Sequence, residues 1–153
     1  MELQDFEMLK RMLMADEGVA YKPYRDTVGK LTIAVGRNLD DTKLNDTEIH
    51  LMLENDILKC YALLSREYDF FSKLTAPRQS ALLNMCFNLG FNGCKNFKKM
   101  WQAIEAGDYK QAAQEMLNSK WHKQVGERVD RLAYIIELGC VKDDWYKEFK
   151  KIG

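Results

Sequence analysis

The sequence predicts an α+β fold in which one short β-hairpin is embedded in a mostly helical chain. Apolar residues recur at helical spacing over most of the 153 residues. Residues 31–35 instead alternate between larger apolar and smaller residues, the pattern of a half-buried strand. The hydrophobic fraction of 46% and the charged fraction of 30% are those of a soluble globular protein. The length suits one domain or two small lobes.

The first predicted helix spans Leu3 to Asp16. Its apolar stripe consists of Leu3, Phe6, Leu9, Met12 and Leu13. Gly18 follows as the predicted left-handed cap, so Glu17 lies at the C-terminal end of the helix. The partial negative charge of that end disfavours an ionised carboxylate, which suits a general acid better than a base.

The hairpin has its turn in residues 26–30, and two registers are open. A two-residue turn at Val28 and Gly29 would pair Asp26 with residue 31 and send Asp26 and Thr32 to opposite faces. A three- or five-residue loop centred on Gly29 would make Asp26 and Thr32 direct neighbours, able to hold a water between them. With a protonated Glu17 opposite, this set has the parts of an inverting glycosidase.

An ordinary structural interpretation competes with the catalytic one. A Glu at a helix end is commonly a surface residue, and an Asp before a turn is expected for local hydrogen bonding. Spacing alone therefore leaves both interpretations of Glu17 and Asp26 open.

Two later helices have clear boundary signals. Asn45 and Glu48 form a predicted capping box that opens a helix running to about Tyr68. Thr75 is the predicted cap of a nearly all-apolar helix over residues 78–89 that ends at Gly90. Asn84 is a polar side chain on this second helix and must find hydrogen-bond partners.

The pattern Glu-x8-Asp-x5-Thr, followed by Ile-Ala-Val-Gly, resembles the active-site segment of the phage-type lysozymes, glycoside hydrolase family 24. The family positions are Glu17, Asp26, Thr32 and Gly36, and the likeness extends from Phe6 to about Trp145. It implies a single lysozyme domain over residues 1–153 with a lysozyme-like two-lobed fold. Residues 14–60 would form a small β-containing lobe and residues 70–153 a helical lobe, connected by a long helix and joined by helix 1. The active site would lie in the cleft between the lobes.

The resemblance also implies an activity, hydrolysis of the β-1,4 bond between N-acetylmuramic acid and N-acetylglucosamine of bacterial peptidoglycan. Glu17 would protonate the leaving oxygen, Asp26 would act on the attacking water, and Thr32 would help to hold that water. Arg128 matches a family arginine next to the catalytic acid, so it is the candidate partner of Glu17, with Asn84 near the same acid.

The resemblance also implies contacts with the substrate and between helix and hairpin. The positions that align with substrate contacts are Asn38, Phe87, Met100 and Glu115, of which the last two differ in type from the best-known relative. Arg37 would pair with Asp56 and thereby tie the hairpin to the long helix. Two other functions remain open: a lytic transglycosylase, which needs the Glu but no Asp/Thr pair, and a non-catalytic peptidoglycan-binding module.

Charge and composition limit the kinds of binding partner and cellular location that we expect. The net charge is zero, but residues 1–75 carry a net −4 and residues 76–153 a net +4, which is too little to predict nucleic-acid binding. Neither a signal peptide nor a membrane anchor is visible, so we expect synthesis in a host cytoplasm and action on periplasmic peptidoglycan after release. The four cysteines lie far apart with no Cys-x-x-Cys spacing, and three of them fall in apolar stretches, where we expect reduced, buried thiols. The isolated His50 and His122 predict no metal site, and no cofactor is expected. A monomer is the default expectation.

Overall fold

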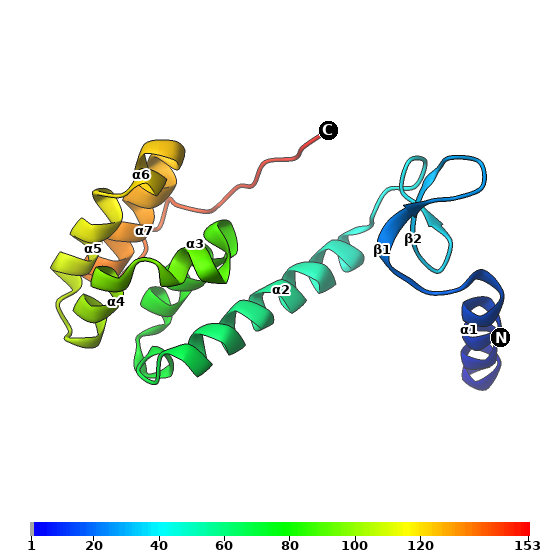
Figure 1. Ribbon diagram of the computed structural model, residues 1–153, viewed down its shortest axis with the longest axis horizontal. Coiled ribbons are helices and arrows are strands. Elements are labelled where there is room, and N and C mark those ends of the chain that lie inside the picture. Colours follow the sequence, from blue (N-terminus) through cyan, green and yellow to red (C-terminus); the bar gives the residue numbers. More distant parts are fainter. Residues whose placement is uncertain (1) are drawn as a thin grey trace. The chain divides into compact units, whose positions relative to one another are not determined.

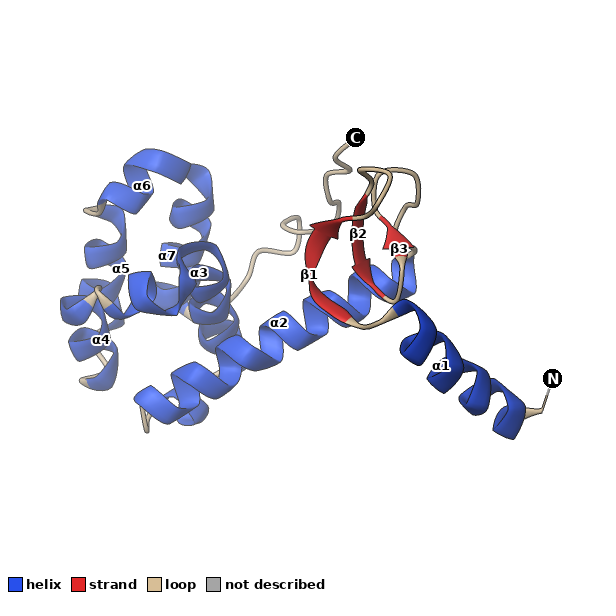
Figure 2. Ribbon diagram, turned by 45° about the vertical axis from the view of Figure 1, so that its right-hand side comes forward, coloured by secondary structure: helices blue, strands red, loops and turns tan. Residues whose placement is uncertain are grey.

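The computed structural model describes residues 2–153, and the chain divides into two units, Met1–His50 and Leu51–Gly153 (Figure 1). The first unit contains α1 (Leu3–Glu17), β1 (Ala20–Arg25), β2 (Leu31–Ala34) and β3 (Arg37–Asn38). The three strands form one antiparallel sheet in the order β1-β2-β3 (Figure 2). The mostly helical α+β fold is therefore confirmed.

The end of α1 differs slightly from the prediction. The helix includes Glu17, and Gly18 has φ 78° and ψ 167°. The positive φ was expected, but the ψ value places Gly18 outside the left-handed helical region. Its N–H still closes the last turn by donating to the carbonyl of Met14 at 3.1 Å.

The hairpin adopts neither of the two predicted registers. Tyr24 lies opposite Thr32 and Arg25 opposite Leu31, so the loop consists of the three residues 27–29 and is centred on Val28. The N–H of Gly29 donates to the carbonyl of Asp26 at 3.0 Å, and Gly29 has φ 83°. This is the loop type in which a tight turn is followed by a positive-φ glycine. The expectation that Asp26 lies directly opposite Thr32 is therefore wrong.

The start of α2 (Asp46–Glu67) confirms the capping box. The N–H of Glu48 donates to Asn45 Oδ1 at 2.9 Å, and the N–H of Asn45 donates to Glu48 Oε2 at 2.8 Å. The other carboxylate oxygen of Glu48 forms a 2.7 Å ion pair with Arg37. Arg37 thus has a partner that the sequence did not single out, and its expected pairing with Asp56, a residue of the other unit, stays a prediction.

The second unit is helical. It contains most of α2, the short 3₁₀ helix η1 (Phe71–Lys73), and five further helices: α3 (Ala76–Lys95), α4 (Lys98–Glu105), α5 (Tyr109–Leu117), α6 (Lys120–Val125) and α7 (Glu127–Leu138). The predicted end at Gly90 appears as a break inside α3, where Gly90 has φ 75° and ψ 162°. Thr75 occupies the cap position, but its side chain makes no capping hydrogen bond.

The hydrophobic core lies in the helical unit. Every buried hydrophobic side chain among the described residues falls between Leu64 and Ile136. The central helix α3 contributes Ala81, Leu82, Met85, Cys86 and Cys94 to it. Within residues 2–153, no helix has the combination of length and apolar character needed to cross a lipid bilayer.

Candidate active site

The predicted site residues fall into two groups, one in each unit. Glu17, Asp26, Thr32 and Asn38 belong to the first unit, and Asn84, Phe87, Met100, Glu115 and Arg128 belong to the helical unit. The geometry of each group is described separately below.

Glu17 lies against the turn that joins β2 to β3. A β-carbon at position 36 would lie 3.4 Å from Oε2 of Glu17, so the carboxylate contacts the space that Gly36 leaves open. Gly36 has φ 65°, which also favours glycine, and Ala34 on the other side of the same turn has φ 57°. The Glu17 side chain is solvent-exposed. The turn thus brings the last residue of α1 next to the sheet.

Asp26 is fixed by its own turn. Its Oδ1 accepts hydrogen bonds from the N–H of Val28 at 3.0 Å and from the N–H of Lys30 at 2.8 Å. This is the local hydrogen bonding that the structural interpretation expected of an Asp before a turn. Among residues 2–153, no donor is bound to its second oxygen, Oδ2, and the side chain is half-buried. One oxygen therefore holds the loop while the other remains available.

Thr32 is the one buried polar residue among the described residues, with 3% of its surface exposed. Its hydroxyl donates to the carbonyl of Lys30 at 3.0 Å, which leaves the oxygen's lone pairs unused by that bond. Because Tyr24 lies opposite Thr32, alternation along the strand places Asp26 on the same face as Thr32, displaced by two residues. The pair is thus diagonal, and both side chains bind the backbone of Lys30.

The polar side-chain atoms of Asn38 form hydrogen bonds within the loop that follows β3. Its Oδ1 accepts hydrogen bonds from the N–H groups of Asp40 and Asp41, and its Nδ2 donates to Asp41 Oδ2 at 2.9 Å. Asp40, a residue that the sequence did not single out, accepts from the N–H of Leu31 at 2.9 Å. These contacts fix the loop after β3 beside the start of β2.

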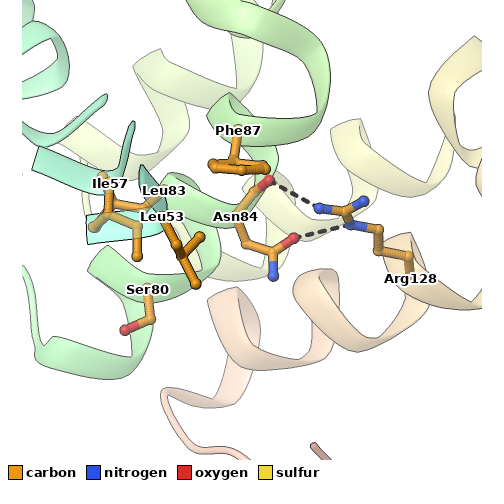
Figure 3. Close-up of a pocket in the computed structure, with 7 residues that line it drawn as sticks. All are labelled: Leu53, Ile57, Ser80, Leu83, Asn84, Phe87 and Arg128. Carbon is orange, nitrogen blue, oxygen red and sulfur yellow. Dashed lines mark hydrogen bonds between the residues drawn. The ribbon is translucent and has the colours of Figure 1, made fainter. Parts of the chain in front are cut away.

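In the helical unit, Asn84 and Arg128 bind each other (Figure 3). Arg128 Nε donates to Asn84 Oδ1 at 2.9 Å, and another guanidinium nitrogen donates to the Asn84 carbonyl at 3.4 Å. Asn84 has therefore found the partner that a polar residue on an apolar helix requires. The predicted pairing of Arg128 with Glu17, a residue of the other unit, stays a prediction.

The Asn84–Arg128 pair lines a cavity of about 390 Å³. Its other walls are mainly apolar, as Figure 3 shows: Leu53, Ile57, Ser80, Leu83 and Phe87. Phe87 is 47% exposed, unusual for a large aromatic side chain on the central helix. A mainly apolar cavity with one convergent polar pair is typical of a small-ligand site.

Met100 and Glu115 lie together at a second hollow of the helical unit, about 400 Å³ in volume and also lined by Lys98 and Lys99. Met100 is fully buried, so it forms part of the wall. Glu115 is half-buried and accepts a hydrogen bond from Gln111 Nε2 at 3.0 Å. The structure thus separates these two residues from the cavity that contains Asn84, Phe87 and Arg128.

Sequence reasoning missed several residues that line the first cavity. Leu83, Asn84 and Phe87 lie three, four and seven residues after Ser80, which places all four on one face of α3. That spacing was available in the sequence and would have drawn attention to Ser80. Among residues 2–153, no cluster of three or more His, Cys, Asp or Glu side chains is arranged to hold a metal ion.

Known proteins resemble this chain over most of its length. The family model described as Phage lysozyme matches residues 14–134. The chain is 29% identical to probable T4-type lysozyme 2 of Dictyostelium discoideum, over 88% of this chain and 96% of that protein. It is 30% identical to the SAR-endolysin of Escherichia phage Mu, over 80% of this chain and 70% of that protein. The pre-baseplate central spike protein Gp5 of Enterobacteria phage T4 is 28% identical over 86% of this chain, which corresponds to 28% of its own length.

Proposed function

Because the chain belongs to the phage lysozyme family and is therefore a glycoside hydrolase, we propose that it is an endolysin-type muramidase. Its substrate would be the glycan strand of bacterial peptidoglycan in the periplasm, on which it acts as a monomer. The bond cleaved is the β-1,4 linkage between N-acetylmuramic acid and N-acetylglucosamine. The observation that carries the proposal is the position of Glu17 beside Gly36, in the same unit as Asp26 and Thr32.

In this proposal Glu17 is the general acid. It is the last residue of α1, and its carboxyl group lies beside the turn that joins β2 to β3. Its exposure leaves it accessible to a glycan, and its proton would pass to the leaving glycosidic oxygen.

Asp26 and Thr32 would hold and activate the attacking water. Asp26 Oδ2 is available to accept a proton from that water, since Oδ1 is occupied by the two backbone N–H groups of the loop. The Thr32 oxygen, having donated its own hydrogen to Lys30, can accept a second hydrogen bond from the same water. Attack by a water held by a base, with protonation by a separate acid, gives inversion at the anomeric carbon.

The residues of the helical unit would support the reaction and bind the glycan. The bond from Arg128 to Asn84 pre-orients the guanidinium group, and the exposed Phe87 offers an apolar ring to a sugar face. Asn38, Met100 and Glu115 complete the proposed substrate contacts. Since both groups would serve one reaction, substitutions at Arg128 and at Asp26 should each lower activity.

The decisive experiment is a digest of purified peptidoglycan by the parent protein and by Glu17→Gln, with the products identified by mass spectrometry. Glutamine is nearly the same size but cannot donate a carboxyl proton, so we expect the rate to fall by about 10²–10⁴-fold. The matched control is Asp16→Asn, which removes a charge from the neighbouring, exposed position of α1. Hydrolysis should leave reducing N-acetylmuramic acid ends.

Each alternative has its own signature in the same digest. An unchanged rate in Glu17→Gln would remove the proposed acid. Products with 1,6-anhydro ends from the parent protein would instead identify a lytic transglycosylase. Intact glycan strands after long incubation, with the protein bound to them, would identify a non-catalytic binding module.

A further inference from the structure

The register of the sheet in the first unit places a tyrosine beside the proposed water-binding threonine. Tyr24 of β1 lies opposite Thr32 of β2, and Thr32 lies opposite Asn38 of β3. Side chains of directly opposed residues project from the same face of an antiparallel sheet. Asp26, two residues after Tyr24, continues on that face. These four residues therefore share one face, and Tyr24 was not singled out in the sequence.

Tyr24 and Thr32 differ in how far solvent reaches them. Thr32 exposes 3% of its surface, whereas Tyr24 exposes 42%. The β-carbons of two directly opposed residues are about 4.5–5.5 Å apart. A molecule that approaches this face of the sheet therefore meets the tyrosine side chain next to the threonine hydroxyl.

Most tyrosines of this chain have a partner for their ring. Five of the seven contact another aromatic ring or a cation: Tyr61, Tyr68, Tyr109, Tyr134 and Tyr146. The ring centroids of Tyr68 and Trp101, for example, are 3.9 Å apart. Within residues 2–153, no such partner is found for Tyr21 or Tyr24, both of which belong to β1. The ring of Tyr24 is thus free to pack against a ligand.

A sugar is the kind of ligand that suits this face. One side of a pyranose ring presents C–H groups, which pack against an aromatic ring, and its edge presents hydroxyl groups. Tyrosine offers a large apolar ring together with a hydroxyl group, and it loses little conformational freedom on binding. On the same face, Asp26 Oδ2 and the Thr32 oxygen are the proposed acceptors for the attacking water. A sugar held against Tyr24 would therefore lie next to that water.

We propose that Tyr24 binds the substrate, with its ring packed against the sugar whose anomeric carbon is attacked by the water of Asp26 and Thr32. The proposed contact rests on the muramidase function above and adds a substrate-binding residue to it. The apolar ring supplies most of the interaction, and the hydroxyl group supplies less. Because the contact exists both before and during the reaction, its loss raises KM more than it lowers kcat.

The kinetic test compares three variants of the full chain on soluble glycan strands of peptidoglycan. Tyr24→Leu removes the ring and should raise KM by about tenfold, with kcat within about threefold of the parent value. Tyr24→Phe retains the ring and should leave KM within about twofold. The matched control is Tyr21→Leu, the same change in the same strand at a side chain that is 92% exposed. Tyr21 lies between Ala20 and Tyr24, where the pairing with β2 is irregular, so its KM should equal the parent value.

A second measurement needs no substitution of Tyr24. Glu17→Gln, which should bind glycan without cleaving it, is footprinted with hydroxyl radicals in the presence and absence of glycan strands. Mass spectrometry of a proteolytic digest then gives the oxidation of each tyrosine. Bound glycan should lower the oxidation of Tyr24 relative to that of Tyr21, which serves as the internal reference.

Several results would overturn the proposed contact while the muramidase function stands. These are hydrolysis by Tyr24→Leu with the parent KM, an equal rise in KM for Tyr24→Phe or Tyr21→Leu, and glycan that leaves the oxidation of Tyr24 unchanged. A parent protein that releases no reducing ends would instead contradict the proposed function. The footprint would then decide whether Tyr24 contacts glycan, as it also would if Tyr24→Leu failed to fold.

Discussion

The two units of this protein differ in the interactions that stabilise each of them internally. The unit Met1–His50 contains a single buried side chain among its described residues, that of Thr32, whereas the helical unit contains all the buried hydrophobic ones. The first unit is fixed by polar contacts to the backbone, such as those made by Asp26, Thr32 and Asn38. The proposed acid and base thus lie on a scaffold defined by hydrogen bonds, while stability from the hydrophobic effect is concentrated in the helices.

The largest effect on stability should come from truncation in the helical core. Leu82→Ala removes a fully buried side chain from α3 and should cost about 2–5 kcal/mol of unfolding free energy. Ile33→Ala in β2 removes a side chain that is only half-buried, so its cost should be clearly smaller. Urea unfolding followed by circular dichroism measures both. Equal costs would contradict the contrast between the two units.

The next largest effect should separate the two functions of Asp26. Asp26→Ala leaves the N–H groups of Val28 and Lys30 without their acceptor and should cost about 1–3 kcal/mol. Asp26→Asn keeps an oxygen acceptor for both N–H groups, so stability should be nearly retained while lytic activity is lost with the carboxylate. Unfolding curves and peptidoglycan digests of the two variants provide the comparison. Full activity in Asp26→Asn would leave this residue with a structural role alone.

Two glycines with positive φ, Gly139 after α7 and Gly29 in the hairpin loop, should give a smaller difference in stability. Gly139→Ala forces a side chain into the left-handed conformation at φ 74°, and the new β-carbon would lie 3.1 Å from the Arg78 guanidinium. That guanidinium donates hydrogen bonds to the carbonyls of Ile136 and Glu137, so it cannot move away without breaking them.

We therefore expect Gly139→Ala to cost about 1–2 kcal/mol, measured as a lowered urea midpoint. Gly29 in the hairpin has φ 83°, but the β-carbon of an alanine there would lie in open space. Gly29→Ala should therefore cost only the backbone strain. A larger loss in Gly29→Ala would show that the hairpin loop is the less tolerant of the two.

The smallest effect should appear as a pH dependence. Hydrogen bonding from Arg37, followed by that from the N–H of Asn45, holds the pKa of Glu48 below its ordinary value of 4.5. A lowered folded-state pKa stabilises the fold above pH 4.5, and this stabilisation is lost as the pH falls through the folded-state pKa. Glu48→Gln preserves the cap but not the ion pair. The stability difference between parent and variant should therefore shrink on acidification, as followed by thermal unfolding across this pH range; a constant difference would exclude a contribution from the ionised carboxylate.

Local signals in the sequence predicted much of the fold. The capping box of Asn45 and Glu48 depends on near neighbours in the chain and is confirmed. The helix end predicted at Gly90 is also a local signal, and it appears as a break inside α3, which continues to Lys95. The hairpin register was mispredicted because it is decided by Asp26 Oδ1 binding two N–H groups at once, which stabilises a loop centred on Val28. The ion pair of Arg37 with Glu48 was not predicted, because the family analogy pointed to Asp56, whereas the cap of α2 positions Glu48 beside Arg37.

The candidate site was predictable in part. The spacing of Glu17, Asp26 and Thr32 predicted that these residues form one catalytic set, and all three belong to the unit Met1–His50. The cavity beside Asn84 and Arg128 could not be predicted in full, because it depends on how the sides of α2, α3 and α7 face one another.

The shared attachment of Asp26 and Thr32 to Lys30 has a consequence for how this segment can diverge. Both side chains bind main-chain atoms of residue 30, so its side chain is free to vary while the number of residues between positions 26 and 32 is not. Insertion or deletion of one residue there would uncouple the two side chains even if both were retained. Loop length, more than residue identity at position 30, is therefore the feature by which distant homologues that keep this geometry should be recognised.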